Sequence, residues 1–264
     1  MQLDACLRSL AENAPYIETP QVLYKATSPE YAQGYAVVAD EHDADLVPER
    51  GLFSDGARAL LLGCLEEHVL MLCDDSITYL PLPADPVNVM EPDVICFSLR
   101  LGANTTYCYP RDIDHGVPHF TPRGPFLTWG WRDAPDGDLF HWQGKEGDFG
   151  YPYSLDGAVH RRDSLLEWSQ GAAGNPNQME GYVVAAIGQR KDLPPRMASY
   201  PLSVQVGLPL NVVNTTHSNR VGLTYPRDPQ ELNARFLDGE RIRYERMDFD
   251  NVIGAHQELE LVIA

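Results

Sequence analysis

The chain has 264 residues, of which 44% are hydrophobic and 22% are charged. This composition is typical of a globular fold and excludes the disordered and collagen-like classes. Its 38 acidic and 20 basic residues give a formal net charge of −18. Because that charge repels phosphate backbones, we expect no nucleic-acid partner. It favours instead a basic protein or a cationic ligand.

The cysteines and the first residues of the chain indicate a compartment. The five cysteines have scattered spacings and include no C-x-x-C pair, which argues against a disulfide framework. The first residues lack the basic start and apolar run of a signal peptide, and no apolar run approaches the ~18 residues of a membrane helix. We therefore expect a cytoplasmic protein that does not cross a membrane.

Hydrophobic periodicity and turn residues predict helices and strands in chain order. Residues 3–14 carry apolar residues at helical spacing, which predicts a helix that docks on the rest of the protein. Further helices are predicted at 56–67 and 161–173, and strands at 68–73, 93–101, 181–188, 202–213, 240–249 and 257–264. In 93–101 apolar and polar residues alternate, so we expect this strand to bury one face.

Several short phrases occur twice in the same order. DGA at 55–57 returns at 156–158, and YPRD at 109–112 returns at 225–228. The phrase NTT precedes YPRD in both places. We interpret these matches as an internal tandem duplication of a unit of about 110 residues.

These observations predict an α+β fold, mostly antiparallel β with a few short helices. Residues 1–50 would supply a helix and a lead-in strand that pack on a first α+β unit at 51–132. A second unit would follow at 133–264, and the two units would form one compact body.

The two halves differ most at 111–153, which is dense in aromatic residues. Because Pro135, Asp136 and Gly137 form a good turn, we predict a β-hairpin around them. Its rings could pack internally, form a recognition surface, or line a small-molecule pocket. The rings expected to bind a partner or ligand are those of Phe126, Trp129, Trp131, Phe140 and Trp142.

Carboxylates and imidazoles cluster in the same stretch. Asp112, Asp114, His115 and His119 could serve as catalytic acids and bases. Together with His119 and His141, His115 could also bind a divalent transition metal. Exposed loop histidines beside aspartates are, however, more often solvated than functional, and no motif predicts a cofactor.

Two functions remain open from the sequence. The first is a soluble acidic protein that binds a basic protein partner, as an inhibitor, immunity protein or adaptor does, through an aromatic hairpin at 120–153. The second is a small-molecule enzyme, a hydrolase or isomerase with or without a metal, whose His/Asp site lies at 112–141. The charge and the aromatic residues favour the first function, and the lack of a recognised catalytic motif weakens the second.

Overall fold

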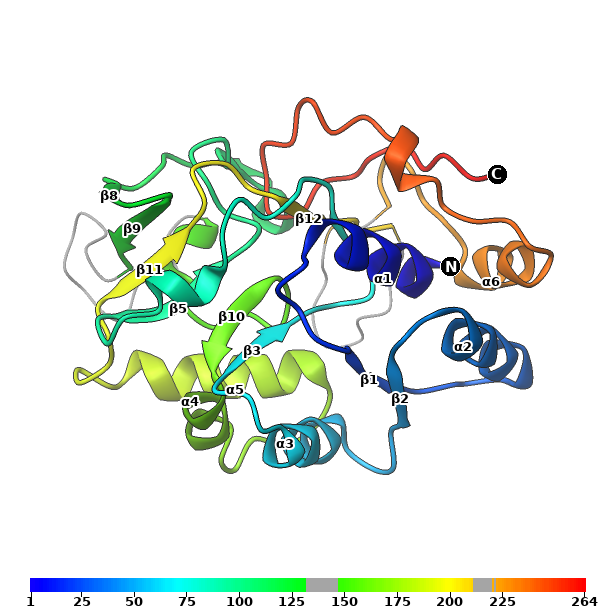
Figure 1. The fold of residues 1–264 in the computed structure, drawn as a ribbon, viewed down its shortest axis with the longest axis horizontal. Helices are drawn as coiled ribbons and strands as arrows, with labels where there is room; N and C mark the ends of the chain where they lie inside the picture. The colour runs from blue at the N-terminus through cyan, green and yellow to red at the C-terminus, as the bar shows by residue number, and fades with distance from the viewer. Residues whose placement is uncertain (132–146, 211–219, 221) are drawn as a thin grey trace.

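The computed structural model of the protein describes residues 1–131, 147–210, 220 and 222–264 (Figure 1). The largest sheet has six strands in the order β3-β10-β5-β11-β9-β8. Its members are β3 (His68–Met71), β5 (Val94–Ser98), β8 (Thr121–Arg123), β9 (Phe126–Gly130), β10 (Ala158–Arg161) and β11 (Arg196–Ser199). β5 and β11 run parallel, whereas the other neighbours run antiparallel, so the sheet is mixed.

The other strands form three two-stranded sheets within the described residues. β1 (Gln21–Tyr24) pairs in parallel with β2 (Asp45–Pro48). β4 (Ser76–Thr78) and β12 (Gln205–Gly207) pair antiparallel, as do β6 (Tyr107–Cys108) and β7 (Ile113–Asp114).

Six α-helices occur in the described part of the chain. They are α1 (Gln2–Asn13), α2 (Pro29–Glu41), α3 (Phe53–Gly63), α4 (Arg162–Trp168), α5 (Pro176–Gly188) and α6 (Pro229–Leu237). None of these helices has both the length and the unbroken apolar character that a bilayer crossing requires.

Helices cover both faces of the main sheet. In Figure 1, α4 and α5 lie along its lower side and α3 packs against both of them. Leu165 of α4 and Ile187 of α5 share one apolar cluster with Cys96 of β5. Leu10 of α1 shares a second cluster with Phe97 of β5. The expectation that 93–101 buries only one face is therefore wrong, because every residue of β5 is buried and apolar side chains pack on both of its faces.

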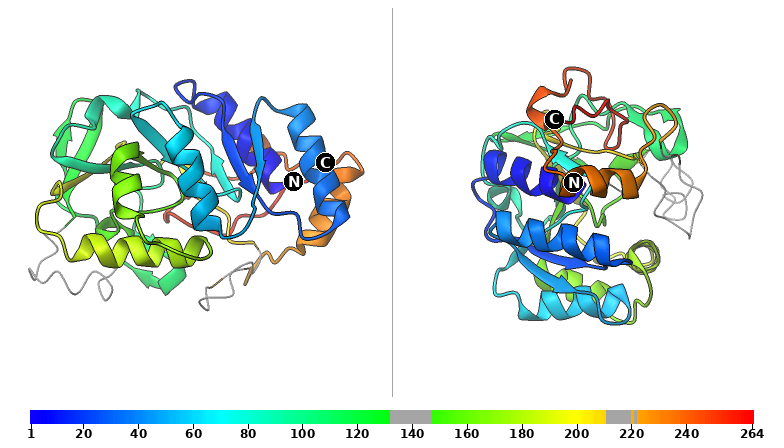
Figure 2. Two further views of the ribbon diagram at one scale, coloured as in Figure 1. Left: turned by 90° about the horizontal axis from the view of Figure 1, so that it is seen from below. Right: turned by 90° about the vertical axis from the view of Figure 1, so that its right-hand side faces the viewer.

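A smaller group of elements lies beside the main sheet. Figures 1 and 2 show α2, α6, β1 and β2 together at one end of the molecule, near both termini. α2 packs against α6, and α3 packs against β1. This end therefore joins residues from the beginning and the end of the chain.

The α+β class is confirmed, but the structure does not show the predicted duplication. The segment 181–188, predicted as the strand equivalent to 68–73, lies in α5. Asn175 caps this helix and forms a capping box with Gln178, and Pro176 occupies its first turn. These start signals determine the helix, because an apolar run without alternation is compatible with either a buried helix or a buried strand.

The two YPRD phrases also differ in structure. Residues 109–111 form a short 3-10 helix, after which Asp112 adopts a left-handed conformation with φ 58°. In the second copy Asp228 caps α6 and accepts a hydrogen bond from the Gln230 backbone N–H. The shared phrase is therefore not evidence of a shared unit.

The predicted division into 1–50, 51–132 and 133–264 does not correspond to separate sheets. β3 and β5 come from the first predicted unit and β10 and β11 from the second, yet all four belong to one sheet. The strands predicted at 240–249 and 257–264 are also absent from the described structure, where an isolated bridge joins Ile242 to Ile263.

Candidate functional site

Four polar side chains, two of them buried and two half-buried, meet between the loop before β10, the segment after β5 and the C-terminal segment. We call Arg100, Ser154, Asp156 and His256 the Arg100 cluster. Oδ1 of Asp156 accepts hydrogen bonds from the Ser76 hydroxyl at 2.6 Å and from the Cys73 backbone N–H at 3.2 Å. Oδ2 of Asp156 accepts a hydrogen bond from Nη1 of Arg100 at 2.8 Å. The Asp156 carboxylate is therefore fixed from three directions.

Arg100 follows β5, and its side chain is only 9% exposed. Its Nη1 lies 2.9 Å from Nε2 of His256, and its Nη2 donates to the Ser154 hydroxyl at 2.9 Å. Nε of Arg100 is buried and has no hydrogen-bond partner among the described residues. A buried guanidinium is stable only when its charge and its donors are matched, so this N–H is a donor still open to a ligand group.

A small cavity of about 30 Å³ adjoins the cluster. Arg100, Asp148, Tyr151 and Ser154 supply its polar lining, and Met197 is among its apolar residues. A cavity of this size holds roughly one or two water-sized groups. It therefore suits the polar end of a small molecule.

His115 and Asp148 form a second pair in the same region. Nε2 of His115 lies 3.8 Å from Oδ2 of Asp148, and the histidine side chain is only 2% exposed. Neither of these two buried atoms has a hydrogen-bond partner among the described residues. Oδ1 of Asp148 accepts a hydrogen bond from the Cys108 thiol at 3.7 Å. A small movement would bring the imidazole and the carboxylate into direct contact.

The environment favours the charged forms of both members of this pair. Burial lowers the pKa of His115, but the Asp148 carboxylate and the Gly116 carbonyl raise it more, so the net pKa is above the ordinary value. Burial raises the pKa of Asp148, but His115, His256 and Arg100 together bring it below the ordinary value. An imidazolium beside a carboxylate is therefore the favoured state at slightly acidic pH.

His256 differs from His115 in its electrostatic surroundings. Burial first and the adjacent Arg100 cation second lower the pKa of His256 to about 4. His256 is therefore neutral at neutral pH, and its Nε2 can accept a hydrogen bond from Arg100. The two histidines have opposite protonation tendencies, which is common where acid and base roles are divided.

Three glycines leave room for Arg100, His256 and His115. An added Cβ would lie 2.7 Å from Cγ of Arg100 at Gly157, 2.7 Å from Cδ2 of His256 at Gly207, and 2.6 Å from Cγ of His115 at Gly147. Gly147 and Gly157 also have φ values of +98° and +65°. At these three positions the backbone lies so close to the neighbouring side chain that any residue with a Cβ would clash with it.

Of the four predicted catalytic residues, only His115 is buried in this region. Asp112 is exposed and pairs with Arg220 at 2.7 Å, and it accepts a hydrogen bond from the Tyr107 hydroxyl at 2.6 Å. Asp114 and His119 are also exposed. The carboxylate that His115 meets is Asp148, which the sequence analysis did not select.

The predicted binding rings in the described part of the chain lie in the interior. Phe126 packs against Phe97, the Trp129 indole N–H donates to the Phe149 carbonyl at 2.9 Å, and that of Trp131 donates to the Pro194 carbonyl at 2.8 Å. All three rings are buried, so they offer no exposed recognition surface. The predicted contributions of Phe140, His141 and Trp142 lie outside the described residues.

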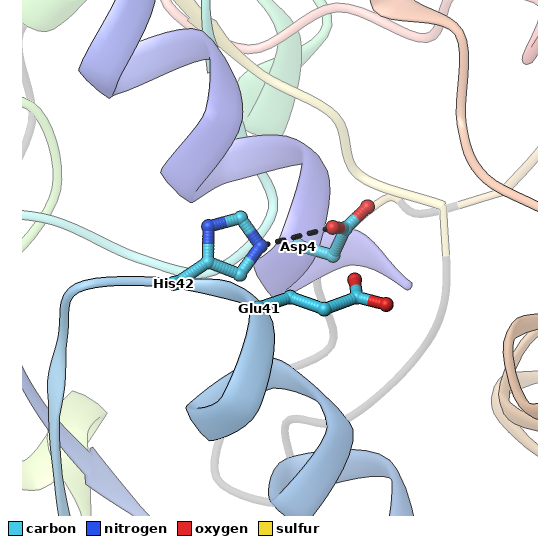
Figure 3. A group of neighbouring side chains, drawn as sticks. All are labelled: Asp4, Glu41 and His42. Carbon is cyan, nitrogen blue, oxygen red and sulfur yellow. Dashed lines mark hydrogen bonds and ion pairs between the residues drawn. The ribbon is translucent and has the colours of Figure 1, made fainter.

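Two groups of side chains within the described residues have a spacing suited to a metal ion, and neither contains His115 or His119. Figure 3 shows the first, in which Nε2 of His42 lies 3.0 Å from Asp4 and Glu41 lies beside them. Arg8 lies 3.1 Å from Asp4, and Arg241 lies 2.6 Å from Glu41. Because these guanidiniums already neutralise the carboxylates, the group is an ion-pair network linking α1, α2 and the C-terminal segment.

The second group comprises Cys73, Asp75 and Asp156. Arg100 occupies one oxygen of Asp156, and the Ser76 hydroxyl and the Cys73 backbone N–H occupy the other. Burial, followed by the charges of Asp156 and Asp74, raises the pKa of Asp75 well above its ordinary value. A carboxyl whose burial disfavours its charged form, beside a carboxylate already paired with a cation, is a poor metal ligand set.

Sequence reasoning missed Arg100, Asp156 and His256. One feature of the sequence points to Arg100: it is a charged residue in the mostly apolar segment 93–101, where a charge needs a buried partner. A weaker one points to Asp156, because the Asp-Gly dipeptide at 156–157 is a common turn signal. Neither signal reveals that residues 100, 156 and 256 meet, because only the fold brings them together.

The chain matches no family model and no curated protein. Its function is therefore inferred from the geometry of the Arg100 cluster and of the His115–Asp148 pair. Arg100, Ser154 and Asp148 line the small cavity, and His115 lies 3.8 Å from Asp148 outside the cavity lining. Nε of Arg100, Nε2 of His115 and Oδ2 of Asp148 are buried without a hydrogen-bond partner among the described residues.

Proposed function

We propose that this protein is a small-molecule enzyme that uses acid–base chemistry, with its site at the cavity beside Arg100. The observation that carries the proposal is a group of three buried polar atoms without a hydrogen-bond partner among the described residues: Nε of Arg100, Nε2 of His115 and Oδ2 of Asp148, of which the last two lie 3.8 Å apart as an ion pair. Such atoms are costly in a protein interior, so their concentration at one place favours a ligand site. Hydrolysis and isomerisation are the reaction classes that fit.

Each group has a distinct role in this proposal. Asp148 lines the cavity, whereas His115 lies 3.8 Å from Asp148 and is not part of the cavity lining. His115, whose pKa is raised, therefore supplies a proton that the Asp148 carboxylate passes to the substrate. Arg100, fixed by Asp156, presents its free N–H to an oxygen that gains negative charge in the transition state. The small cavity admits only the reacting end of the substrate, such as a carbonyl group.

The proposal depends on His115 acting through Asp148, which lines the cavity. The test measures kcat/KM of the protein on a panel of small esters, amides and hydroxyketones. We expect His115→Gln to reduce kcat/KM by roughly 100-fold or more, which is the usual contribution of general acid–base catalysis. Asp148→Asn should shift the pH profile in addition.

His119→Gln is the matched control, because His119 lies in the same loop but is exposed. It should leave kcat/KM within about twofold, since a solvated side chain away from the cavity makes no transition-state contact. Equal losses at the two histidines, or no turnover of any compound in the panel, would contradict the proposed function.

A further inference from the structure

A larger groove lies on the C-terminal part of the protein, separate from the Arg100 cluster. Its volume is about 350 Å³, which is within the ordinary range for ligand pockets. Tyr225, Met247, Leu259 and Val262 supply apolar surface to its lining. We call this feature the C-terminal groove.

The groove carries an excess of negative charge. Asp248, Glu258 and Glu260 line it together with a single cation, Arg246. Neither Asp248 nor Glu260 is part of an ion pair within the described chain, and both are exposed; Oδ1 of Asp248 accepts a hydrogen bond from the Asp250 backbone N–H at 3.0 Å, which leaves its charge unpaired. Their carboxylates are therefore available to a cation that enters the groove.

Glu258 is held differently from the other two carboxylates. It accepts hydrogen bonds from the backbone N–H groups of Leu223, Thr224 and Tyr225, and from the Tyr109 hydroxyl. Burial raises the pKa of Glu258, but these donors lower it more, so the net pKa is below the ordinary value. With both oxygens occupied, Glu258 contributes a fixed negative charge rather than a further contact.

We propose that the C-terminal groove binds an arginine or lysine side chain of a basic protein partner. The methylene stem of such a side chain would pack on the apolar lining, and its charged end would meet Asp248 and Glu260. The formal charge of −18 on the whole chain adds long-range attraction for the same partner. Arg246 repels such a cation. Removing the charge of Arg246 should therefore strengthen binding, whereas removing the charge of Asp248 or Glu260 should weaken it.

The probe is the peptide acetyl-Gly-Arg-Gly-amide, titrated into the ¹⁵N-labelled full chain while backbone amide shifts are followed. The comparison peptide replaces arginine with citrulline, which has nearly the same shape and no charge. We expect the arginine peptide to shift amides at 246–248 and 257–262, and the citrulline peptide to bind much more weakly. Similar binding of the two peptides, no binding at millimolar concentration, or shifts confined to other parts of the protein would overturn the proposal.

Variants then test the individual charges. Asp248→Asn or Glu260→Gln should raise the Kd for the arginine peptide about two- to fivefold, which is usual for one partly exposed ion pair. Arg246→Gln should lower the Kd by a similar factor. Glu18→Gln changes the net charge equally at an exposed position outside the groove and should leave the Kd unchanged. If Glu18→Gln matched the groove variants, the binding would reflect net charge alone and the proposal would be wrong.

Discussion

Gly157 offers the sharpest test of how the backbone supports Arg100. An alanine Cβ at this position would lie 2.3 Å from Oε1 of Gln205 and 2.7 Å from Cγ of Arg100. Both side chains are buried, so neither can move away freely. Gly157→Ala should therefore disturb the Arg100 cluster directly.

The expected cost has two parts. A left-handed conformation costs an alanine roughly 1 kcal/mol. Overpacking against Arg100 and Gln205 adds about 1–3 kcal/mol. Gly124 separates the two contributions, because its φ of +61° nearly equals the +65° of Gly157 while nothing lies within 4 Å of its added Cβ. Gly124→Ala therefore bears only the conformational cost.

The free energy of unfolding of the two variants and the parent can be measured by urea denaturation at constant pH. We expect Gly157→Ala to lose about 1–3 kcal/mol more than Gly124→Ala. Equal losses for the two variants would refute the argument that the turn at 157 is closely packed against Arg100.

Three further predictions concern the buried polar and aromatic groups. Asp156→Asn should lower the free energy of unfolding by about 3 kcal/mol or more, because it leaves the Arg100 cation buried without its counter-ion. The double variant that also carries Arg100→Met should recover part of that loss when both are measured by urea unfolding. Burial lowers the pKa of His160 to about 4 from an ordinary 6.5, so the unfolded chain binds the proton first as pH falls. The free energy of unfolding should therefore drop about 3 kcal/mol less between pH 7 and pH 4 in His160→Phe than in the parent, and an unchanged pH dependence would contradict the burial of His160. Trp129→Phe should lower the free energy of unfolding by about 1–3 kcal/mol, because it removes the hydrogen bond to the Phe149 carbonyl and leaves a gap in the core. Peptide binding at the C-terminal groove should be unchanged. A loss of peptide binding would mean that Trp129 has a recognition role.

Local signals in the sequence were sufficient for the elements whose residues specify them alone. The helix predicted at 3–14 is α1, and the strands predicted at 68–73 and 93–101 contain β3 and β5. The run at 181–188 was misassigned because its apolar residues carry no period, and the deciding cap at Asn175 lies upstream. At 240–249 the β-like composition did not produce a paired strand, because pairing depends on a neighbour that the sequence does not reveal.

The candidate site was predictable only in part. His115 was selected because it is an imidazole beside aspartates, but the choice among Asp112, Asp114 and a more distant carboxylate depends on how the loop folds. The structure places Asp148 beside His115 and exposes the two nearer aspartates. The aromatic residues at 126–131 were expected at a surface, yet alternation along a strand predicts which side chains share a face and not which face is covered. Trp129 and Trp131 are covered by the core.

The central claim is that His115 and Asp148 form an electrostatically coupled pair at the functional site. The most direct measurement is the pKa of His115 by NMR in the parent and in Asp148→Asn, with the exposed His119 as an internal reference. We expect a His115 pKa above 6.5 in the parent, a clear fall in Asp148→Asn, and no change at His119. A His115 pKa that is the same in both proteins would show that the two groups are not coupled and would contradict the proposed site.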